Sequence, residues 1–134
     1  MLLLAHAGVT LVLVGLIWTI QLVHYPLFRH VEASSWDAFH DAHGMRITWL
    51  VGLLMPIEVL LAGTLVFQDP SLLTWTGVGL LAVIWLSTAL IQVPLHQRLG
   101  GGFDAEVHSR LVTSNWIRTV AWTLRGLLAV HLLA

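Results

Sequence analysis

Histidines are unusually frequent in this short chain. Eight of its 134 residues are His, and none is Cys. The lack of Cys excludes disulfides, thiolate nucleophiles and iron–sulfur clusters. A bound metal would therefore use imidazole, carboxylate or a porphyrin, which suits iron, copper or haem. Imidazole also exchanges protons near neutral pH, so a proton relay is the second chemistry that this composition offers.

Four histidines have positions that favour a shared site. His40 and His43 are three residues apart, and on a helix this spacing places both rings on one face, within reach of one ion. His24 and His96 each lie two residues from a proline, at the polar end of an apolar stretch. We expect metal ligands among His24, His40, His43 and His96. The alternative is that these rings are merely solvated at a membrane interface.

Two charged residues lie deep inside apolar segments. Glu58 comes nine residues before Phe67, and Arg125 comes nine residues before Ala134. With a helical rise of about 1.5 Å per residue, each lies about 13 Å from the end of its segment. An unpaired charge at such depth costs about 2.5–3.5 kcal/mol on insertion scales. We therefore expect Glu58 and Arg125 to face one another or to share a ligand, as a structural or a functional pair.

The last segment carries further polar residues on one helical face. This stripe consists of His108, Asn115, Arg118, Trp122 and Arg125. Our catalytic candidates are Glu58, as general acid or base, Asn115 and Arg118, which would orient a phenolate or quinone oxygen, and Arg125. Gln21, His24, Gln92 and His96 are the candidate cofactor-binding residues.

The elements that position these residues belong to a membrane protein. Hydrophobic residues form 57% of the chain and charged residues 10%, against roughly 25% charged in a soluble domain. The mean hydropathy of +0.86 agrees. The net charge of −1 excludes a nucleic-acid-binding module, which needs a basic face. The lipid bilayer is therefore the first expected partner.

Apolar stretches of about 20 residues predict an all-α fold, a four-transmembrane-helix up-and-down bundle in one membrane domain, residues 1–134. The expected helices are residues 2–28, 36–67, 71–98 and 104–133. Five of the six Arg residues lie on or near the connectors after the first and third helices. By the positive-inside rule both connectors are cytoplasmic and both termini lie outside, in a bacterial inner membrane.

The two halves of the chain resemble one another. Gln21 is 25 residues before Arg46, and Gln92 is 26 residues before Arg118. A proline follows each Gln and a polar connector follows each proline. This repeated order of Gln, Pro and polar connector predicts two similar helical hairpins, related as parallel repeats. The alternative is that two membrane hairpins look alike by chance.

Smaller residues predict local details. On the first helix, Ala5, Gly8 and Gly15 lie nearly opposite the polar face, and we expect this small-residue face to pack against other helices. In the short connector between the second and third helices, Asp69 is the expected N-cap and Pro70 the first helical residue. Prolines beside polar groups also free backbone carbonyls that could line a cavity.

One segment of the chain resembles a known family. Pro94-Leu-His96-Gln-Arg98 and the later pattern Asn115-Trp-x-Arg118-Thr are similar to the C-terminal half of the small four-helix anthrone-oxygenase-like membrane proteins. The resemblance covers roughly the last third of the chain, and the first half departs from the family pattern. It implies an oxygenase acting on polycyclic phenols. A weaker similarity, in length, architecture and an N-terminal His, is to the small haem-binding protoporphyrinogen oxidase of bacteria, and no haem ligands are transferred from it.

Two classes of function follow. The first is an integral membrane oxidoreductase or oxygenase that acts on a lipophilic, phenolic or quinone-like small molecule in an intramembrane polar pocket, with a metal or haem as the candidate cofactor. The alternative is a non-catalytic accessory or scaffold subunit of a larger membrane complex, partnered by another membrane protein or by further copies of itself. A small transporter or channel is a third reading, in which Glu58 and Arg125 line a substrate or proton path.

Overall fold

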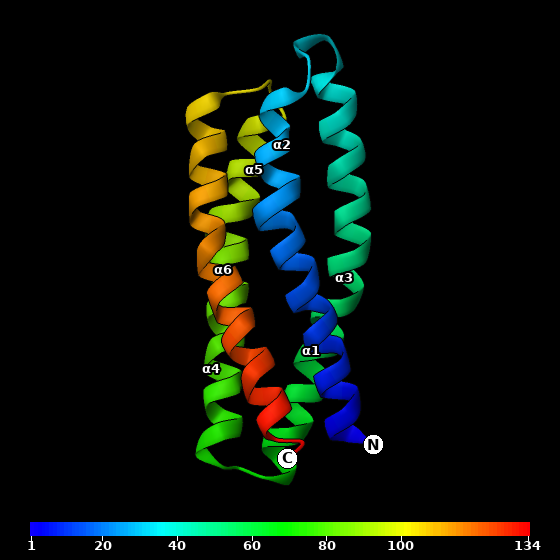
Figure 1. Cartoon of the computed structure of the whole chain (residues 1–134), viewed down its shortest axis with the longest axis vertical. Coiled ribbons are helices and arrows are strands. Elements are labelled where there is room, and N and C mark those ends of the chain that lie inside the picture. The colour runs from blue at the N-terminus through cyan, green and yellow to red at the C-terminus, as the bar shows by residue number, and fades with distance from the viewer.

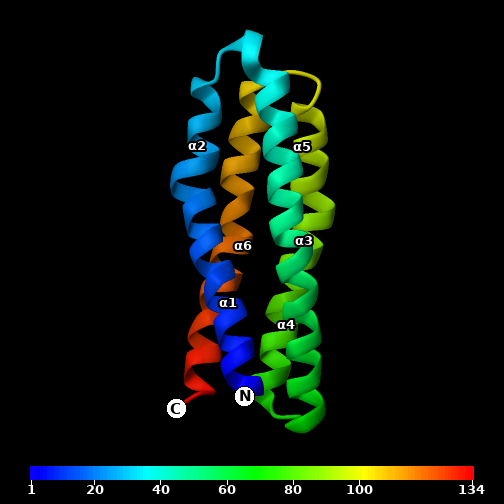
Figure 2. The same cartoon turned by 90° about the vertical axis from the view of Figure 1, so that its right-hand side faces the viewer.

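The computed structural model describes residues 1–134 and contains helices and short connectors but no strands. Four long helical rods run alongside one another, and the two termini lie at the same end of the molecule (Figures 1 and 2). Three of the rods are long and apolar enough to cross a membrane, namely Leu2–His30, Ala33–Gln68 and Leu72–Leu99. The expectation of a helical membrane protein is thus confirmed. The fourth rod, α6 (Ala105–His131), is not among the three.

The first and third rods are interrupted, whereas the second and fourth are mostly regular α-helix. The first rod contains α1 (Leu2–Thr19), the π-helical η1 (Ile20–His24), α2 (Tyr25–Leu27) and the 3-10 turn η2 (Phe28–His30). The second contains the 3-10 turn η3 (Ala33–Ser35) and α3 (Trp36–Gln68). The third contains α4 (Leu72–Ser87), the π-helical η4 (Thr88–Gln92) and α5 (Val93–Leu99). The rod ends differ from the expected ends by at most three residues.

The two π-helical segments occupy corresponding positions in the first and third rods. Each is five residues long and ends two residues before a proline, Pro26 or Pro94. Proline has no N–H and clashes with the carbonyl four residues earlier, so the regular α-helical ladder cannot continue through it. Pro56 lies inside α3, which remains α-helical throughout. The wider turn is therefore a shared feature of these two rods and does not follow from proline alone.

Side-chain caps fix where two of the helices begin. Asp104 caps α6, because its carboxylate accepts hydrogen bonds from the backbone N–H groups of Glu106 and Val107, at 2.8 and 2.9 Å. The start of α4 corrects an expectation. Its N-cap is Ser71, not Asp69, and Ser71 forms a capping box with Thr74. Pro70 thus lies outside the helix, since the hydroxyls of the next residues satisfy the free backbone groups.

The helix α6 packs against both α1 and α4 and buries its polar face between them. Two apolar clusters surround that face, one near the long connectors around Phe28 and one in the middle of the bundle around Trp122. Many large apolar side chains point outward instead, among them Leu60, 70% exposed, and Phe67, 89% exposed. Such a surface is stable in a lipid bilayer and unfavourable in water.

The expected small-residue packing face of α1 is wrong. Ala5, Gly8 and Gly15 are exposed, and a Cβ added at either glycine would meet nothing within 4 Å. The helix packs through the face that carries its polar groups, because α6 offers hydrogen-bond partners there and lipid offers none. The close backbone approach is instead at Gly126 of α6, where a Cβ would lie 3.0 Å from Cγ2 of Val14.

Candidate functional site

The deepest polar group is the ion pair between Glu58 of α3 and Arg125 of α6. The Nε of Arg125 lies 2.9 Å from Oε1 of Glu58, and their side chains are 1% and 0% exposed. The predicted pairing of these two residues is confirmed. Both charges lie among apolar helices, where each would be costly alone.

Four further groups complete the hydrogen bonding of this pair. Thr10 and Trp122 donate to the two carboxylate oxygens of Glu58, at 3.0 and 3.1 Å. The guanidinium of Arg125 also donates to the carbonyl oxygen of Gly77, and its Nη2 lies 3.3 Å from Nε2 of His6. The pair is thus sealed by neighbouring helices. This environment is typical of a structural ion pair, since no part of the carboxylate is open to a ligand.

A second network of hydrogen-bonded polar side chains lies one to two helical turns nearer the long connectors and ends at Arg118. The amide nitrogen of Gln21 donates to the carbonyl of Val112, at 3.1 Å, and its oxygen accepts from the amide nitrogen of Asn115, at 2.8 Å. The oxygen of Asn115 accepts in turn from Nε and Nη2 of Arg118. Both ends of each side-chain amide in this network have a hydrogen-bond partner. The network therefore fixes the guanidinium of Arg118 in one orientation.

Arg118 has no carboxylate partner. The ion pairs in the structure are Arg110–Glu106, on the surface, and Arg125–Glu58. Beyond Asn115, Arg118 donates only to two hydroxyls, Oγ1 of Thr88 and the phenol oxygen of Tyr25, both at 3.4 Å. Arg118 is 8% exposed, so bulk water contacts little of its side chain. A buried cation without a counter-ion is costly in a protein interior.

Tyr25 connects this cation to a histidine. Its phenol oxygen lies 2.8 Å from Nε2 of His96. Arginine only donates, so the phenol oxygen accepts from Arg118. In the Nδ1–H tautomer of His96, the phenol proton is donated to Nε2. The backbone carbonyl of Tyr25 also binds Nε2 of His108, at 2.8 Å. Sequence reasoning missed Tyr25. The available signal was that it is the chain's single Tyr and lies directly before Pro26.

The structure brings together the four histidines expected to form a metal site. His24 Nε2 lies 2.8 Å from His43 Nδ1, and the His43 and His96 rings stack at 5.4 Å between centroids. The ring centroids of His40 and His96 are 5.8 Å apart. However, no group of three or more His, Cys, Asp or Glu side chains has a geometry that could hold a metal ion. The structure therefore shows no metal site among these four histidines, and their role as metal ligands stays a prediction.

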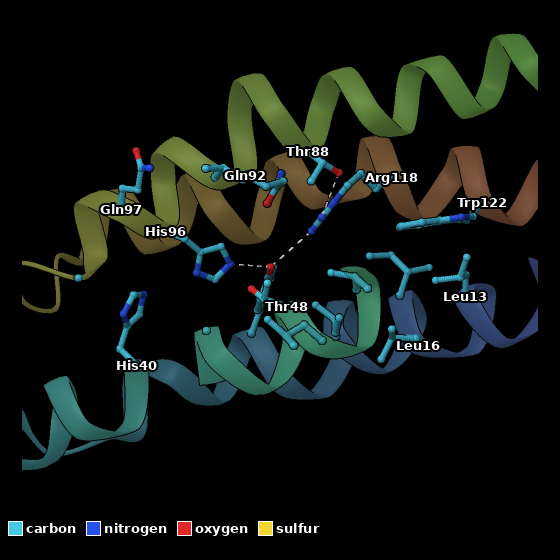
Figure 3. A pocket seen from close by; sticks show the side chains of 18 of the residues that line it. Leu13, Leu16, His40, Thr48, Thr88, Gln92, His96, Gln97, Arg118 and Trp122 are labelled. Atoms are coloured by element: carbon cyan, nitrogen blue, oxygen red, sulfur yellow. Dashed lines mark hydrogen bonds between the residues drawn. The ribbon is translucent and has the colours of Figure 1, made fainter. Parts of the chain in front are cut away.

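A cavity of about 330 Å³ lies beside Arg118, between α1, α3, the α4–α5 rod and α6. Figure 3 shows His40 and Gln97 at one end, Trp122 and Leu13 at the other, and Arg118 and Gln92 between them. Residues that Figure 3 does not label also line the cavity, among them Ile17, Ile20, Tyr25, Asp41, Gly44 and Val93. The cavity is thus apolar toward the middle of the bundle and polar toward the connectors, which suits an amphiphilic ring compound.

Comparisons with known protein families, curated proteins and solved structures find no match. The chemistry of the cavity itself therefore carries the interpretation. Of the eight predicted catalytic or cofactor residues, Arg118, Gln92 and His96 line the cavity, together with the predicted metal ligand His40. Asn115 accepts a hydrogen bond from Arg118 and donates one to Gln21, so these two predicted residues hold Arg118 in place.

The remaining predicted residues lie outside the cavity. Glu58 and Arg125 are separated from it by Trp122, whose ring lines the cavity and whose indole N–H binds Glu58. His24 and His43 line a separate groove formed by η1 and α3. The catalytic role expected for Glu58 therefore has no geometric support, because its oxygens are already bound and face away from the cavity.

The cavity opens sideways between α3 and α5. Asp41 and Thr48 on α3, and Val93 and Gln97 on the other side, line it and are themselves exposed. Its connector end is closed where the indole N–H of Trp36 donates to the carbonyl of Leu99, at 2.8 Å. In a membrane, this arrangement leaves a lateral opening through which a lipophilic molecule could arrive.

Proposed function

We propose that this protein binds a lipophilic, oxygen-bearing ring compound, phenolic or quinone-like, in the cavity beside Arg118. The observation that carries the proposal is the buried guanidinium without a carboxylate partner, next to an apolar cavity of about 330 Å³. A ligand that presents a phenolate or a polarised carbonyl oxygen would supply the missing negative charge. Its ring would pack on Trp122, Leu13 and Ile17, which line the inner end.

The cavity also contains a pair of groups that can move a proton. The phenol oxygen of Tyr25 accepts from Arg118 and lies 2.8 Å from Nε2 of His96, to which it donates when His96 is the Nδ1–H tautomer. When a ligand hydroxyl approaches Tyr25, its proton can pass to the phenol oxygen while the phenol proton passes to His96. Arg118 stabilises the oxyanion at each stage by charge and hydrogen bonding. Tyr25 and His96 thus take the acid–base role that sequence reasoning gave to Glu58.

The narrower proposal is an oxidoreductase or oxygenase. Removing a proton from an activated phenol produces an electron-rich anion, and molecular oxygen is the oxidant of this proposal. An anthrone CH2 group becomes the C=O of a quinone, one atom of O2 enters that carbonyl, and the other is reduced to water. The resemblance of the C-terminal segment to anthrone-oxygenase-like proteins supports this reaction class. The structure shows no group of three or more ligands that could hold a metal ion, and the steps proposed here use only the side chains of the cavity.

We further propose that α6 is a fourth membrane span and that the chain is a duplicated hairpin with both termini outside the cytoplasm. The polar face of α6 is buried among apolar helices, which supports a membrane location despite its low hydropathy. The matching π-helical segments η1 and η4 support the duplication. The orientation rests on the arginines beside the long connectors.

The binding proposal is tested with detergent-solubilised protein and 1-naphthol, a fluorescent lipophilic phenol. We expect saturable binding by the wild type and weakening of about 10- to 100-fold in Arg118→Gln, because a charge-assisted hydrogen bond is lost. Arg110→Gln is the matched control, since Arg110 is exposed and pairs with Glu106 on the surface. Wild-type protein that does not bind the phenol, or equal affinity in both variants, would overturn the proposal in favour of an accessory subunit.

The oxygenase reading is tested by oxygen uptake with an anthrone as the probe. Tyr25→Phe keeps the ring that packs on Phe28, with centroids 5.4 Å apart, but removes the proton-carrying hydroxyl. We expect this variant to bind 1-naphthol and to lose oxygen uptake by a factor of about 100 or more, as expected for a lost acid–base group. Equal oxygen uptake by wild type and Tyr25→Phe would contradict the proton role, while leaving binding at Arg118 intact.

A further inference from the structure

The side chain of Gln92 presents an unused hydrogen-bond acceptor at the cavity. Gln92 ends the π-helical segment η4, is 1% exposed and lines the cavity beside Arg118 (Figure 3). Its oxygen Oε1 is buried and has no hydrogen-bond partner in the protein. Buried polar atoms nearly always have partners, so this exception requires an explanation.

The neighbouring serine determines which end of the Gln92 amide is unpaired. The hydroxyl of Ser114 donates to the carbonyl of Arg110, at 2.7 Å, so its single proton is already used. Ser114 therefore accepts from Gln92, and the group of Gln92 that lies 2.9 Å away must be the amide nitrogen. The amide cannot be flipped without losing this bond. The unpaired atom is thus the oxygen, which can only accept.

Gln21 is the corresponding residue of the first rod, and its side-chain amide provides a comparison in which every hydrogen bond is made within the protein. Its nitrogen donates to the carbonyl of Val112, and its oxygen accepts from Asn115 and from Thr119. Both ends of the Gln21 amide are used, whereas Gln92 uses one. The two residues therefore differ in one atom: Oε1 of Gln92, at the cavity, is an acceptor that the protein does not use.

We propose that the ligand carries a hydroxyl group that donates to Oε1 of Gln92, in addition to the oxygen that faces Arg118. This inference rests on the proposed function and narrows its ligand to ring compounds with at least two oxygen substituents, such as dihydroxyarenes and hydroxyquinones. The oxygen that the proposed function places at Arg118 is a phenolate or a carbonyl and carries no proton, whereas Oε1 of Gln92 only accepts, so the two residues recognise different oxygens. Gln92 thereby determines specificity and Arg118 supplies the charge.

The expected discrimination follows from the cost of an unpaired buried acceptor. A site built to bind a hydroxyl binds the analogue without that proton less well, since the acceptor is left without water or ligand. We expect the preference for a free hydroxyl over a methyl ether to be about 10- to 100-fold. The preference should depend on Gln92 and not on the general polarity of the cavity.

The experiment compares dihydroxynaphthalene isomers with their monomethyl ethers, by fluorescence titration of the solubilised full-length protein. The wild type should bind at least one diol 10- to 100-fold more tightly than its ether. In Gln92→Leu and Gln92→Met this ratio should fall to about one, while 1-naphthol still binds. Gln68→Leu is the matched control, because Gln68 is exposed at the far end of α3. Its ratio should equal that of the wild type.

The outcomes separate this inference from the proposed function. If 1-naphthol binds and depends on Arg118, but no diol is preferred by the wild type, the role of Gln92 is overturned and the binding site stands. A preference that persists in both Gln92 variants has the same consequence. If no phenol binds the wild type at all, the proposed function fails together with the inference. A wild-type ratio of about one overturns the role of Gln92 even where a Gln92 variant does not fold, and a high ratio is assigned to Gln92 by whichever of the two variants folds.

Discussion

Arg118 and Arg125 are seven residues apart on α6, about two turns, and both point into the bundle. They are nevertheless in opposite electrostatic situations. Arg125 is neutralised by Glu58, and the carboxylate of Glu58 is in turn bound by Thr10 and Trp122. Arg118 is held only by neutral acceptors. One arginine therefore stabilises the fold, and the other is positioned for a negative charge that the protein does not supply.

The structural role of the deep pair predicts a large loss of stability in Glu58→Gln. The substitution leaves Arg125 charged and unpaired in an apolar interior, and we expect the free energy of unfolding to fall by about 3–5 kcal/mol. Replacing both residues by Leu should restore much of this loss, because no charge is then left buried. Thermal unfolding in detergent measures both effects.

The surface pair provides the control for the Glu58 experiment. Glu106→Gln breaks the exposed contact with Arg110 and should change stability by less than about 1 kcal/mol. Glu58→Gln that unfolds no earlier than Glu106→Gln would contradict the structural role. The same outcome would return Glu58 to the list of functional candidates.

At the residue scale, the sequence predicted partners better than roles. The depth of Glu58 and Arg125 was sufficient to predict that they pair, since a charge in lipid needs a partner. It could not show that Trp122 stands between the pair and the cavity. The contacts of Tyr25 with Arg118 and His96 also could not be predicted, because they join residues of different helices. Which polar groups share a cavity is decided by how side chains of different helices pack.

At the element scale, the π-helical segments determine what the first and third rods present to the bundle. A wider turn shifts the helical face by an extra residue, and such segments frequently mark functional sites. Gln21 and Gln92 lie within η1 and η4, and both are buried. Regular periodicity gives no sign of such a shift. It also misplaced the packing face of α1, because lipid-facing and packed residues of a membrane helix are equally apolar.

The lateral opening between α3 and α5 predicts that a large side chain at Gly44 blocks the cavity. Gly44 lines the cavity, and a Cβ there would meet nothing within 4 Å. Gly44→Phe should therefore fold normally while its ring fills the opening. We expect binding of 1-naphthol to weaken at least tenfold, or its association rate to fall by a similar factor, with an unchanged unfolding temperature.

Gly63→Phe is the matched control for the lateral opening. Gly63 lies on the same helix, is exposed, and also has nothing within 4 Å of an added Cβ, but it does not line the cavity. Its binding and association rate should equal those of the wild type. If Gly44→Phe binds as fast and as tightly as Gly63→Phe, the ligand does not reach Arg118 between α3 and α5.

At the scale of the whole molecule, α6 is the least apolar rod and has more buried polar residues than any other rod, five of 13. Hydropathy alone therefore does not qualify it as a membrane span. Its polar face is covered by α1 and α4, and the side chains that face outward, such as Leu124 and Leu127, are apolar. The membrane would contact only this apolar side. A polar helix can span lipid when the other helices shield it.

We predict the topology of the whole chain from this shielding and from the arginines beside the long connectors. The wild type has no Cys, so single cysteines can be introduced on a clean background. In bacterial spheroplasts we expect a membrane-impermeant maleimide to label Asp69→Cys and Ala134→Cys at once. Ser34→Cys and Gly101→Cys should react only after permeabilisation, because the positive-inside rule places their connectors in the cytoplasm. Labelling of Gly101→Cys and Ala134→Cys from the same side would show that α6 does not cross the membrane, whereas a complete exchange of the two patterns would invert the orientation and preserve the four spans.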